Sequence, residues 1–246
     1  MEKKRIITRR EAIITGLGSM GALLLGGCSK SLPPNYGNIL RMGDNLTYVA
    51  QLALLPGQSL VKEYSYRDIT NFPARGSNPA DSSKPTFNET FARFHKNAFS
   101  EWKLSIEGKV ARPGSYSLVD LQKFPSRKQI TRLTCEEGWS AIAEWIGVPL
   151  SSILHNVGIL PSARFVNFYS YDGWMDSIDL LDAFHPQTIL AYGMNGRDLP
   201  LVHGAPVRLR LETQLGQKST KYLQRIVVTD EFVDTGDSGW AWYVGI

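Results

Sequence analysis

The spacing of apolar and polar residues predicts many short strands and only a few short helices. Apolar and polar positions alternate from Trp102 to Val110, which is the two-residue period of a half-buried strand. The same pattern predicts strands within "KQITRLTC", "RFVNFYSYDG", "TILAYGMNGRDLP", "APVRLRLE" and "KYLQRIVVTDEF". This order of elements predicts one mixed α+β domain.

Capping and turn residues predict where the helices begin and end. "SLVDLQKF" should open a short helix with Ser117 as its N-cap. A second helix is expected in "WIGVPLSSILHNVGI", with Pro149 at its start and Gly158 just past its end. "ARPGSY" is expected to turn, and "SIDLLDAF" to form a helical turn. Residues 57–100 are rich in Pro, Ser, Asn and Asp, which predicts long irregular structure.

The start of the chain has the composition of an export signal. A basic stretch with the paired arginines of "TRREAII" precedes an apolar run that is too short to span a membrane comfortably. The run ends in "LGGC", which resembles the bacterial lipobox, so we expect lipidation of Cys28. We therefore expect a twin-arginine lipoprotein signal over 1–27, a tether and N-terminal segment over 28–56, and one domain over 57–246. The alternative is an ordinary amphipathic helix that stays on the protein.

This signal predicts export by the twin-arginine route and a lipid anchor at the periplasmic or another extracytoplasmic face. The route carries folded proteins, often because a cofactor is inserted in the cytoplasm. The chain has only two cysteines. If Cys28 carries lipid, Cys135 has no disulfide partner in the chain and is either buried and inert or kept for its chemistry.

Composition narrows the function classes further. The chain has 246 residues, of which 43% are hydrophobic and 11% aromatic, enough to bury a sizeable core. The net charge of +4 includes the basic start of the signal, and no run of lysine and arginine follows it. We therefore expect neither nucleic-acid binding nor a further membrane-spanning segment.

Cys135 is the first candidate for chemistry. It ends the strand of "KQITRLTC" and precedes a glycine-containing turn, a position that exposes a side chain at the rim of a sheet. A thiolate there can bind a transition metal, although Glu136 and Glu137 would disfavour it unless a cation or metal offsets their charge. The sequence supports neither a four-ligand zinc site nor C-x-x-C-H haem attachment. A buried, inert thiol is the alternative.

The second candidate is the segment "LVHGAPVRLRLETQLGQKSTKYLQRIVV". We expect a rigid turn from His203 to Pro206, followed by Arg208 and Arg210 on the same side of a strand. "GQKSTK" combines a glycine, two lysines and two hydroxyls, which suits phosphate although the spacing of a P-loop is absent. Arginine adds bidentate recognition of phosphate. A basic, solvated edge strand is the alternative.

These segments resemble the sulfite oxidase superfamily. "RLTCEEGWS" followed by "WIGVPL" is similar to its molybdenum-binding segment, in particular to the pattern C-V-E-x-W-S then W-x-G-x-P-L of the bacterial periplasmic methionine sulfoxide reductase branch. "WKLSIEGKVARPGSYSLVDLQKFP" resembles the opening strand and helix of the family. "LPLVHGAPVRLRL" and "GQKSTKYLQRIVV" resemble its pterin-binding end, so the resemblance covers roughly Trp102 to Trp240.

The resemblance implies a single sulfite-oxidase-type domain that holds molybdenum on one pyranopterin dithiolene, molybdopterin. By position, Cys135 is the metal ligand. Asp172 and Tyr192 are candidate catalytic residues that shape the substrate cavity, with a structural hydrogen bond as the alternative for each. The candidate cofactor contacts are Asn71, Phe72, Cys135, Ser170, His203, Arg208, Gly216, Lys218, Ser219, Thr220 and Lys221.

The implied activity is the transfer of an oxygen atom to or from a small substrate, with electrons exchanged through a separate membrane haem protein or cytochrome. Sulfite-oxidising relatives add arginines around the substrate and a dimerisation domain after the cofactor domain, whereas this chain ends at Ile246. We therefore expect a monomer that reduces a sulfoxide or a similar oxide. The alternatives are a sulfite-type oxidase and a non-enzymatic lipid-anchored module that keeps the fold without molybdenum.

Overall fold

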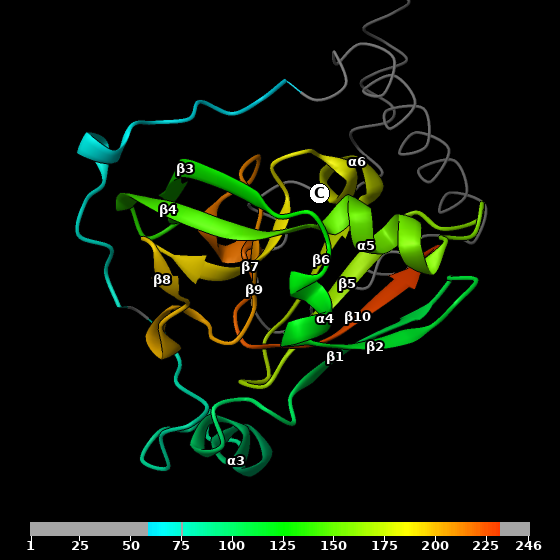
Figure 1. Ribbon diagram of the computed structural model, residues 1–246, viewed down its shortest axis with the longest axis horizontal. Helices are drawn as coiled ribbons and strands as arrows, with labels where there is room; N and C mark the ends of the chain where they lie inside the picture. Colours follow the sequence, from blue (N-terminus) through cyan, green and yellow to red (C-terminus); the bar gives the residue numbers. More distant parts are fainter. Residues whose placement is uncertain (1–58, 75, 232–246) are drawn as a thin grey trace, which may run out of the picture. The chain divides into compact units, whose positions relative to one another are not determined.

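Two β-sheets form the framework of the part of the chain that the structure describes (Figure 1). The chain divides into two units, Met1–Pro56 and Gly57–Ile246. The computed structural model describes residues 59–74 and 76–231, all within the second unit. The expected signal, the tether and Cys28 lie outside the described residues.

The first sheet places the strand after the candidate phosphate segment at its centre. Its strand order is β2-β1-β10-β5-β6. The strands are β2 (Gly114–Ser117), β1 (Lys103–Gly108), β10 (Leu223–Thr229), β5 (Phe165–Ser170) and β6 (Met175–Asp179). β1 and β10 are parallel, and the other neighbours are antiparallel. β10 therefore joins the two halves of this sheet.

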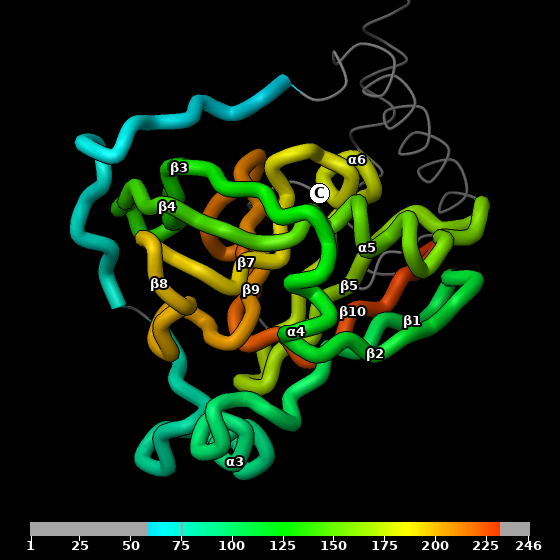
Figure 2. The backbone as a smooth tube through the Cα atoms, in the orientation of Figure 1, coloured from blue at the N-terminus to red at the C-terminus, as the bar shows by residue number. Residues whose placement is uncertain are grey.

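The second sheet carries the candidate metal ligand at one end. Its strands are β3 (Arg127–Thr134), β4 (Ser140–Pro149), β7 (Ile189–Met194), β8 (Arg197–Asp198) and β9 (Arg208–Arg210). They follow the order β3-β4-β7-β8, with β9 also paired to β7, and all the pairs are antiparallel. β3 and β4 form a hairpin that begins at the pair Thr134↔Ser140, and Figure 2 follows its backbone. Cys135 therefore lies in the hairpin turn.

The helices of the described residues are few and short, and each contributes at least one buried side chain to the main core. They are α3 (Glu89–Lys96), α4 (Leu118–Gln122), α5 (Leu150–Val157) and α6 (Leu180–Phe184), with 3-10 turns η1 (Tyr66–Asp68), η2 (Leu201–His203) and η3 (Gly216–Lys218). Ile153 and Leu154 of α5 are fully buried in one cluster with Phe168 of β5 and Ile226 of β10. A smaller cluster surrounds Trp145 of β4.

The structure confirms the predicted mixed α+β class and both capped helices. Ser117 Oγ accepts from Asp120 N at 3.2 Å and so caps α4. α5 follows Pro149 and ends at Gly158, which adopts a φ of 67°. The strand expected from Trp102 to Val110 is present as β1, and the strands expected in the other quoted segments are present as β3, β5, β7, β9 and β10.

Other elements were missed for identifiable reasons. β4 is buried on both faces along most of its length, so its sequence shows no alternation. The prediction of irregular structure throughout 57–100 is wrong at α3, where Asn88 accepts from Phe91 N at 3.0 Å. That helix is too short to show a clear period. β2 pairs with β1 where a turn was expected, and the start of "SIDLLDAF" belongs to β6.

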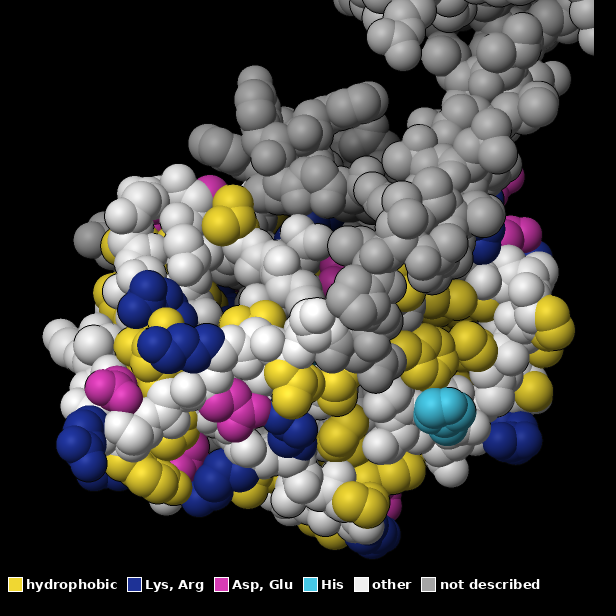
Figure 3. Space-filling view, turned by 90° about the horizontal axis from the view of Figure 1, so that it is seen from above, with side chains coloured by type: hydrophobic (Ala, Val, Ile, Leu, Met, Phe, Trp, Pro, Cys, Tyr) yellow, Lys and Arg dark blue, Asp and Glu magenta, His cyan; other side chains and the backbone are white. Residues whose placement is uncertain are grey.

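The described surface mixes charges of both signs. On the face drawn in Figure 3, lysine and arginine side chains alternate with acidic and apolar ones. No helix of the described residues has the length and apolar character needed to cross a membrane.

Candidate functional site

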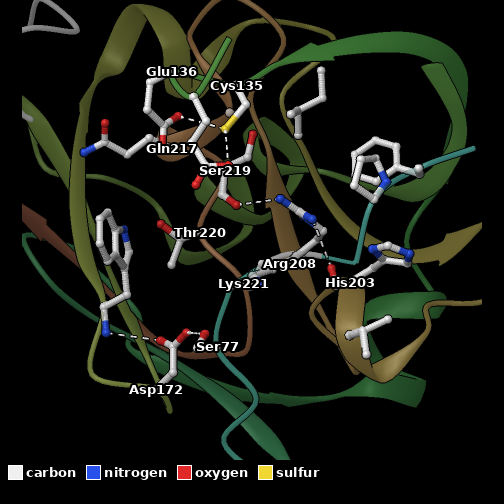
Figure 4. Close-up of a pocket in the computed structure, with 18 of the residues that line it drawn as sticks. Ser77, Cys135, Glu136, Asp172, His203, Arg208, Gln217, Ser219, Thr220 and Lys221 are labelled. Carbon is white, nitrogen blue, oxygen red and sulfur yellow. Dashed lines mark hydrogen bonds between the residues drawn. The ribbon is translucent and has the colours of Figure 1, made fainter. Parts of the chain in front are cut away.

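A cavity of about 540 Å³ brings together segments that are far apart in the sequence (Figure 4). Its wall includes the β3–β4 turn, parts of the 202–221 region and the loop after β5. Residues 70–74 and 76–77, which we call the strap, contribute Phe72, Pro73, Gly76 and Ser77 to the wall. Most of the predicted site residues line it: Phe72, Cys135, Asp172, His203, Arg208, Gly216, Ser219, Thr220 and Lys221.

A tight turn holds Cys135 at one end of the cavity. Cys135 N donates to Trp139 O at 2.8 Å, and Gly138 N donates to Cys135 O at 3.1 Å. The thiol lies 3.3 Å from Glu136 Oε2 and 3.8 Å from Glu137 Oε2. Burial, with smaller contributions from the two carboxylates, raises the pKa of Cys135 to about 11. As the sequence indicated, a thiolate forms here only when a metal or another cation offsets the negative surroundings.

Arg208 provides a buried positive charge at the cavity wall. Its side chain donates from Nη1 to His203 O at 3.0 Å and from Nη2 to Ser219 O at 2.8 Å. No carboxylate of the described residues forms a salt bridge with it. Burial, followed by the charge of Arg210, lowers the pKa of Arg208 to about 9. Because a buried, unpaired charge is costly, a bound anion would stabilise this wall.

Arg208 and Arg210 lie on the same side of β9, as predicted, but they have different surroundings. Both guanidinium groups lie over the Trp145 ring, 5.3 Å and 4.6 Å from its centroid respectively. Arg210 Nη2 donates to Glu212 Oε2 at 2.8 Å in a buried ion pair. Arg210 is therefore neutralised within the protein, whereas Arg208 has no carboxylate partner among the described residues.

Lys221 and His203 extend the basic region. Burial, followed by the charge of Arg208, lowers the pKa of Lys221 to about 8, and Asp172 opposes the change. Burial, then the charges of Arg208 and Lys221, lowers the pKa of His203 to about 4. At neutral pH the wall therefore carries two cations and a neutral imidazole, which is an electrostatic environment for an anion.

Two glycines allow the wall segments to approach closely. Gly204 has a φ of 107°, and a Cβ there would lie 2.9 Å from Lys221 Cβ. A Cβ at Gly216 would lie 2.6 Å from Leu133 Cδ2 of β3. The basic segment can therefore pack directly against the hairpin that carries the thiol.

The remaining predicted residues do not line the cavity: Asn71, Ser170, Tyr192 and Lys218. Lys218 Nζ is buried and donates to Asp176 Oδ1 at 2.8 Å and to Ser177 O at 3.0 Å. Ser170 Oγ donates to Lys221 O at 2.6 Å. Lys218 and Ser170 thus fix the segment 216–221 by hydrogen bonds to residues that lie outside the cavity or to its backbone. Tyr192 packs against the main core, and Asn71 is exposed.

Several cavity residues were not singled out from the sequence. Trp139 lies four positions after Cys135, and its Nε1 donates to Glu137 Oε2 at 2.8 Å. Ser77 of the strap donates from Oγ to Asp172 Oδ2, and its carbonyl accepts from Tyr222 Oη at 2.7 Å. Trp139 was within the quoted motif, whereas the irregular strap offers no period that would reveal its contacts.

The family assignment rests on a match to most of this domain. The family model described as "Oxidoreductase molybdopterin binding domain" matches residues 92–235. The chain belongs to this family. The matched domain is of the oxidoreductase type, and the cofactor of this domain is molybdenum bound to molybdopterin. The matched residues of this molybdopterin-binding domain leave out the strap.

Similar proteins include two methionine-sulfoxide reductase relatives. Over 148 residues the chain is 38% identical to YedZ1 of Azospira oryzae, provisionally named a protein-methionine-sulfoxide reductase subunit, and the match covers 59% of this chain and 56% of YedZ1. Over 146 residues it is 34% identical to the protein-methionine-sulfoxide reductase catalytic subunit MsrP of Ralstonia nicotianae, covering 53% and 44%. The chain thus spans about half the length of these relatives.

A solved structure supports the fold. The sulfane dehydrogenase SoxCD from Paracoccus pantotrophus superposes with a TM-score of 0.51 at 23% identity, over 53% of this chain and 39% of the SoxCD chain. At this identity the likeness concerns the fold alone. It confirms the expected sulfite-oxidase-type architecture of the molybdopterin-binding domain.

The cavity of this domain fits molybdopterin in its polar groups. Buried polar atoms that line it have no hydrogen-bond partner within the described chain: Thr86 Oγ1, Trp174 Nε1, Gln217 Oε1 and Thr220 Oγ1. Such atoms are rare in folded proteins unless a ligand or water satisfies them. Together with the unpaired charge of Arg208 and the thiol of Cys135, they match a ligand that carries an anionic phosphate, hydrogen-bonding ring edges and a metal.

Proposed function

We propose that this chain reduces a sulfoxide, or a similar oxide, of a small substrate with its molybdenum cofactor. The supporting observation is the cavity that joins the Cys135 thiol to the cationic wall of Arg208 and Lys221. The names of MsrP and YedZ1 favour the sulfoxide. The balanced reaction takes two electrons and two protons with each sulfoxide and releases the sulfide and water.

The residues at the two ends of the cavity would bind different parts of the cofactor. The thiolate of Cys135 would bind the metal, and Arg208 and Lys221 would hold the phosphate with the hydroxyls of Ser219 and Thr220. When bound, the cofactor supplies the redox and oxygen-transfer chemistry. The protein contributes orientation, charge and a partly enclosed cavity.

We infer that the chain works outside the cytoplasm. The paired arginines and the lipobox-like "LGGC" support export by the twin-arginine route and lipidation at Cys28. The sequence contains no C-x-x-C-H motif for covalent haem, which supports a separate electron carrier, a membrane haem protein or a cytochrome. We propose that the anchored protein is a monomer.

The decisive experiment measures cofactor first and turnover second. Protein purified after export should contain molybdenum and pterin in about equal amounts. Reduced viologen should then be oxidised on addition of sulfoxides. A protein with neither molybdenum nor pterin would be a non-enzymatic module, and sulfite oxidation without sulfoxide reduction would identify a sulfite-type oxidase.

A further inference from the structure

A basic and aromatic patch lies over β3, and none of its residues lines the cavity. Lys128 and Arg132 are exposed and share one face of β3, because side chains of a strand alternate between its two faces. Segment 59–68, drawn in cyan in Figure 1, runs beside this strand, and its Tyr64 N donates to Ile130 O at 2.8 Å. The surface, which we call the outer patch, consists of Leu60, Lys62, Tyr64, Tyr66, Lys128 and Arg132.

Cation–π contacts order the charged side chains of the outer patch. Lys62 Nζ lies 4.9 Å and Arg132 Cζ lies 5.2 Å from the centroid of the Tyr64 ring. Lys128 Nζ lies 5.9 Å from the centroid of the Tyr66 ring and donates to Tyr66 Oη at 3.2 Å. These contacts restrict the side chains without neutralising them. Less side-chain entropy is therefore lost when a partner binds.

The acidic side chains of segment 59–68 have partners of their own. Glu63 forms an ion pair with Arg127. Asp68 accepts from Ser65 N at 2.9 Å and from Ser65 Oγ at 2.7 Å, which caps η1. Arg67, next to Asp68, is exposed and adds a positive charge. The two carboxylates and the two arginines therefore balance one another and leave the charge of the outer patch unchanged.

The outer patch itself is positively charged. Lys128 Nζ lies 3.3 Å from Oε2 of the buried Glu144, which offsets one of its three cations. Within the described residues, no salt bridge involves Lys62 or Arg132. A surface with uncompensated cations attracts an anionic partner.

Exposed apolar surface accompanies these charges. Leu60 is 60% exposed and Tyr66 is 64% exposed. Cations beside an exposed leucine and tyrosine suit the headgroup region of a bilayer, where lysine and arginine meet phosphates and a tyrosine has one apolar and one wet end. The composition of the outer patch therefore favours a lipid surface over a purely acidic polypeptide.

The outer patch also lies where the chain enters the described domain. Val61 N donates to Gln187 Oε1 at 2.7 Å, and Gln187 Nε2 donates to Val61 O at 3.0 Å. His185 Nε2 lies 3.3 Å from Ser59 O. The patch is thus held to the domain directly after the expected tether. A lipid on Cys28 would raise the effective concentration of the patch at the bilayer, so that a weak affinity is enough.

We propose that the outer patch is a docking surface for the anionic headgroups of a phospholipid bilayer. Phosphate oxygens accept from the side chains of Lys62, Lys128 and Arg132, while Leu60 and Tyr66 enter the headgroup region. The proposed lipid anchor supports this docking, but the patch itself is defined by the described residues alone.

The test follows the reactivity of lysines in the full chain, purified after export, on lipid vesicles. Vesicles of phosphatidylcholine, alone or mixed with phosphatidylglycerol, provide a neutral and an anionic surface. Trace acetylation with an N-hydroxysuccinimide ester, read by peptide mass spectrometry, gives the rate at each lysine. Lys123 on α4 is the internal control, because it is exposed and, like Lys128, pairs with a carboxylate.

Lys62 and Lys128 should react several-fold more slowly on the anionic vesicles than on the neutral ones, whereas Lys123 should react equally on both. Raising the salt concentration should reduce the difference. Arg132→Gln should weaken the protection of Lys62 by up to about fivefold, the contribution of one basic side chain near an anionic bilayer. Lys123→Gln, which removes the same charge elsewhere on the surface, should leave that protection unchanged.

Equal reactivity of Lys62 and Lys128 on neutral and anionic vesicles would overturn the proposal. So would equal protection by soluble polyglutamate, which would assign the outer patch to an acidic polypeptide. The proposed lipid anchor can fail separately, because the mass of the purified protein reports it. Protein without lipid on Cys28 that is still protected when anionic vesicles are added would lose the anchor and keep the docking surface.

Discussion

The two ends of the cavity are built in different ways. At the thiol end, a turn closed by local backbone hydrogen bonds fixes Cys135 and both glutamates. At the basic end, buried side chains from separate elements hold the wall, as in the ion pair of Lys218 with Asp176. The thiol end should therefore tolerate changes elsewhere in the fold, whereas the basic end should depend on distant buried partners.

The largest effect should come from removing the thiol. Cys135→Ser replaces a soft thiolate ligand with a hydroxyl, so molybdenum retention and turnover should each fall by at least about 100-fold. Elemental analysis and the viologen assay measure the two quantities. The cofactor-free variant should unfold at the wild-type temperature, because the turn is closed by backbone atoms. Full molybdenum content in this variant would remove Cys135 as the ligand.

Substitution of two lysines that lie three residues apart should affect different properties, stability in one case and cofactor retention in the other. Lys218→Met leaves Asp176 buried without its cationic partner and should lower the free energy of unfolding by about 3 kcal/mol. Lys221→Met should leave the cofactor-free protein much closer to wild-type stability, but should weaken cofactor retention by about tenfold. Urea unfolding and pterin content separate these outcomes.

Lys218→Met with Asp176→Asn is the matched control for the buried pair. Removing both charges should recover part of the lost stability, because no unpaired ion remains in the core. If instead Lys221→Met proved the more destabilising change, or Lys218→Met altered only cofactor retention, the assignment of the two lysines to core and cavity would be wrong.

These lysines also show how much of the candidate site could be predicted from the sequence. Residue type and motif identified Cys135, Arg208 and the "GQKSTK" segment, because the chemistry of phosphate and metals limits the choice of side chain. They did not separate Lys218 from Lys221, since that distinction depends on Asp176 in another strand. The buried partner is a tertiary contact that no local pattern contains.

The same limit applies to the fold. Strands with one exposed face, such as β1, were predicted from alternation, and α4 from Ser117. β4 is buried on both faces and was missed, although it forms half of the hairpin that positions Cys135. Phe72 of the strap was predicted from the resemblance, whereas Ser77 joins the cavity through contacts that only the assembled domain creates.

A smaller effect should appear in the pH dependence of the basic end. The pKa of His203 falls from 6.5 in the unfolded chain to about 4 in the folded one. Between these values the unfolded state binds the proton preferentially, so the stability contribution is complete above pH 6.5 and is lost as the pH falls through 4. For this half-exposed ring the loss is about 1 kcal/mol.

His203→Gln provides the comparison. The variant lacks the titrating group, so its cofactor-free form should lose about 1 kcal/mol less stability than the wild type between pH 7 and pH 4. Urea unfolding at both pH values measures the difference. The matched control is His155→Gln, on α5 and outside the cavity wall. An identical pH dependence of wild type and His203→Gln would show that His203 is not buried beside the cations.

The smallest effect should come from the strap. Ser77 Oγ donates to Asp172 Oδ2 in a partly buried contact, and Asp172 Oδ1 also accepts from Trp174 N at 3.1 Å. Ser77→Ala should therefore cost about 0.5–1 kcal/mol of unfolding free energy, because Asp172 keeps one partner and the Ser77 carbonyl still accepts from Tyr222. Ser83→Ala removes a similar serine–aspartate bond on the exposed surface and should cause no measurable change. If both variants behaved alike, the strap would contribute its apolar contacts to the cavity but no stabilising hydrogen bond, and the basic end would depend on the buried partners of Lys218 and Arg208.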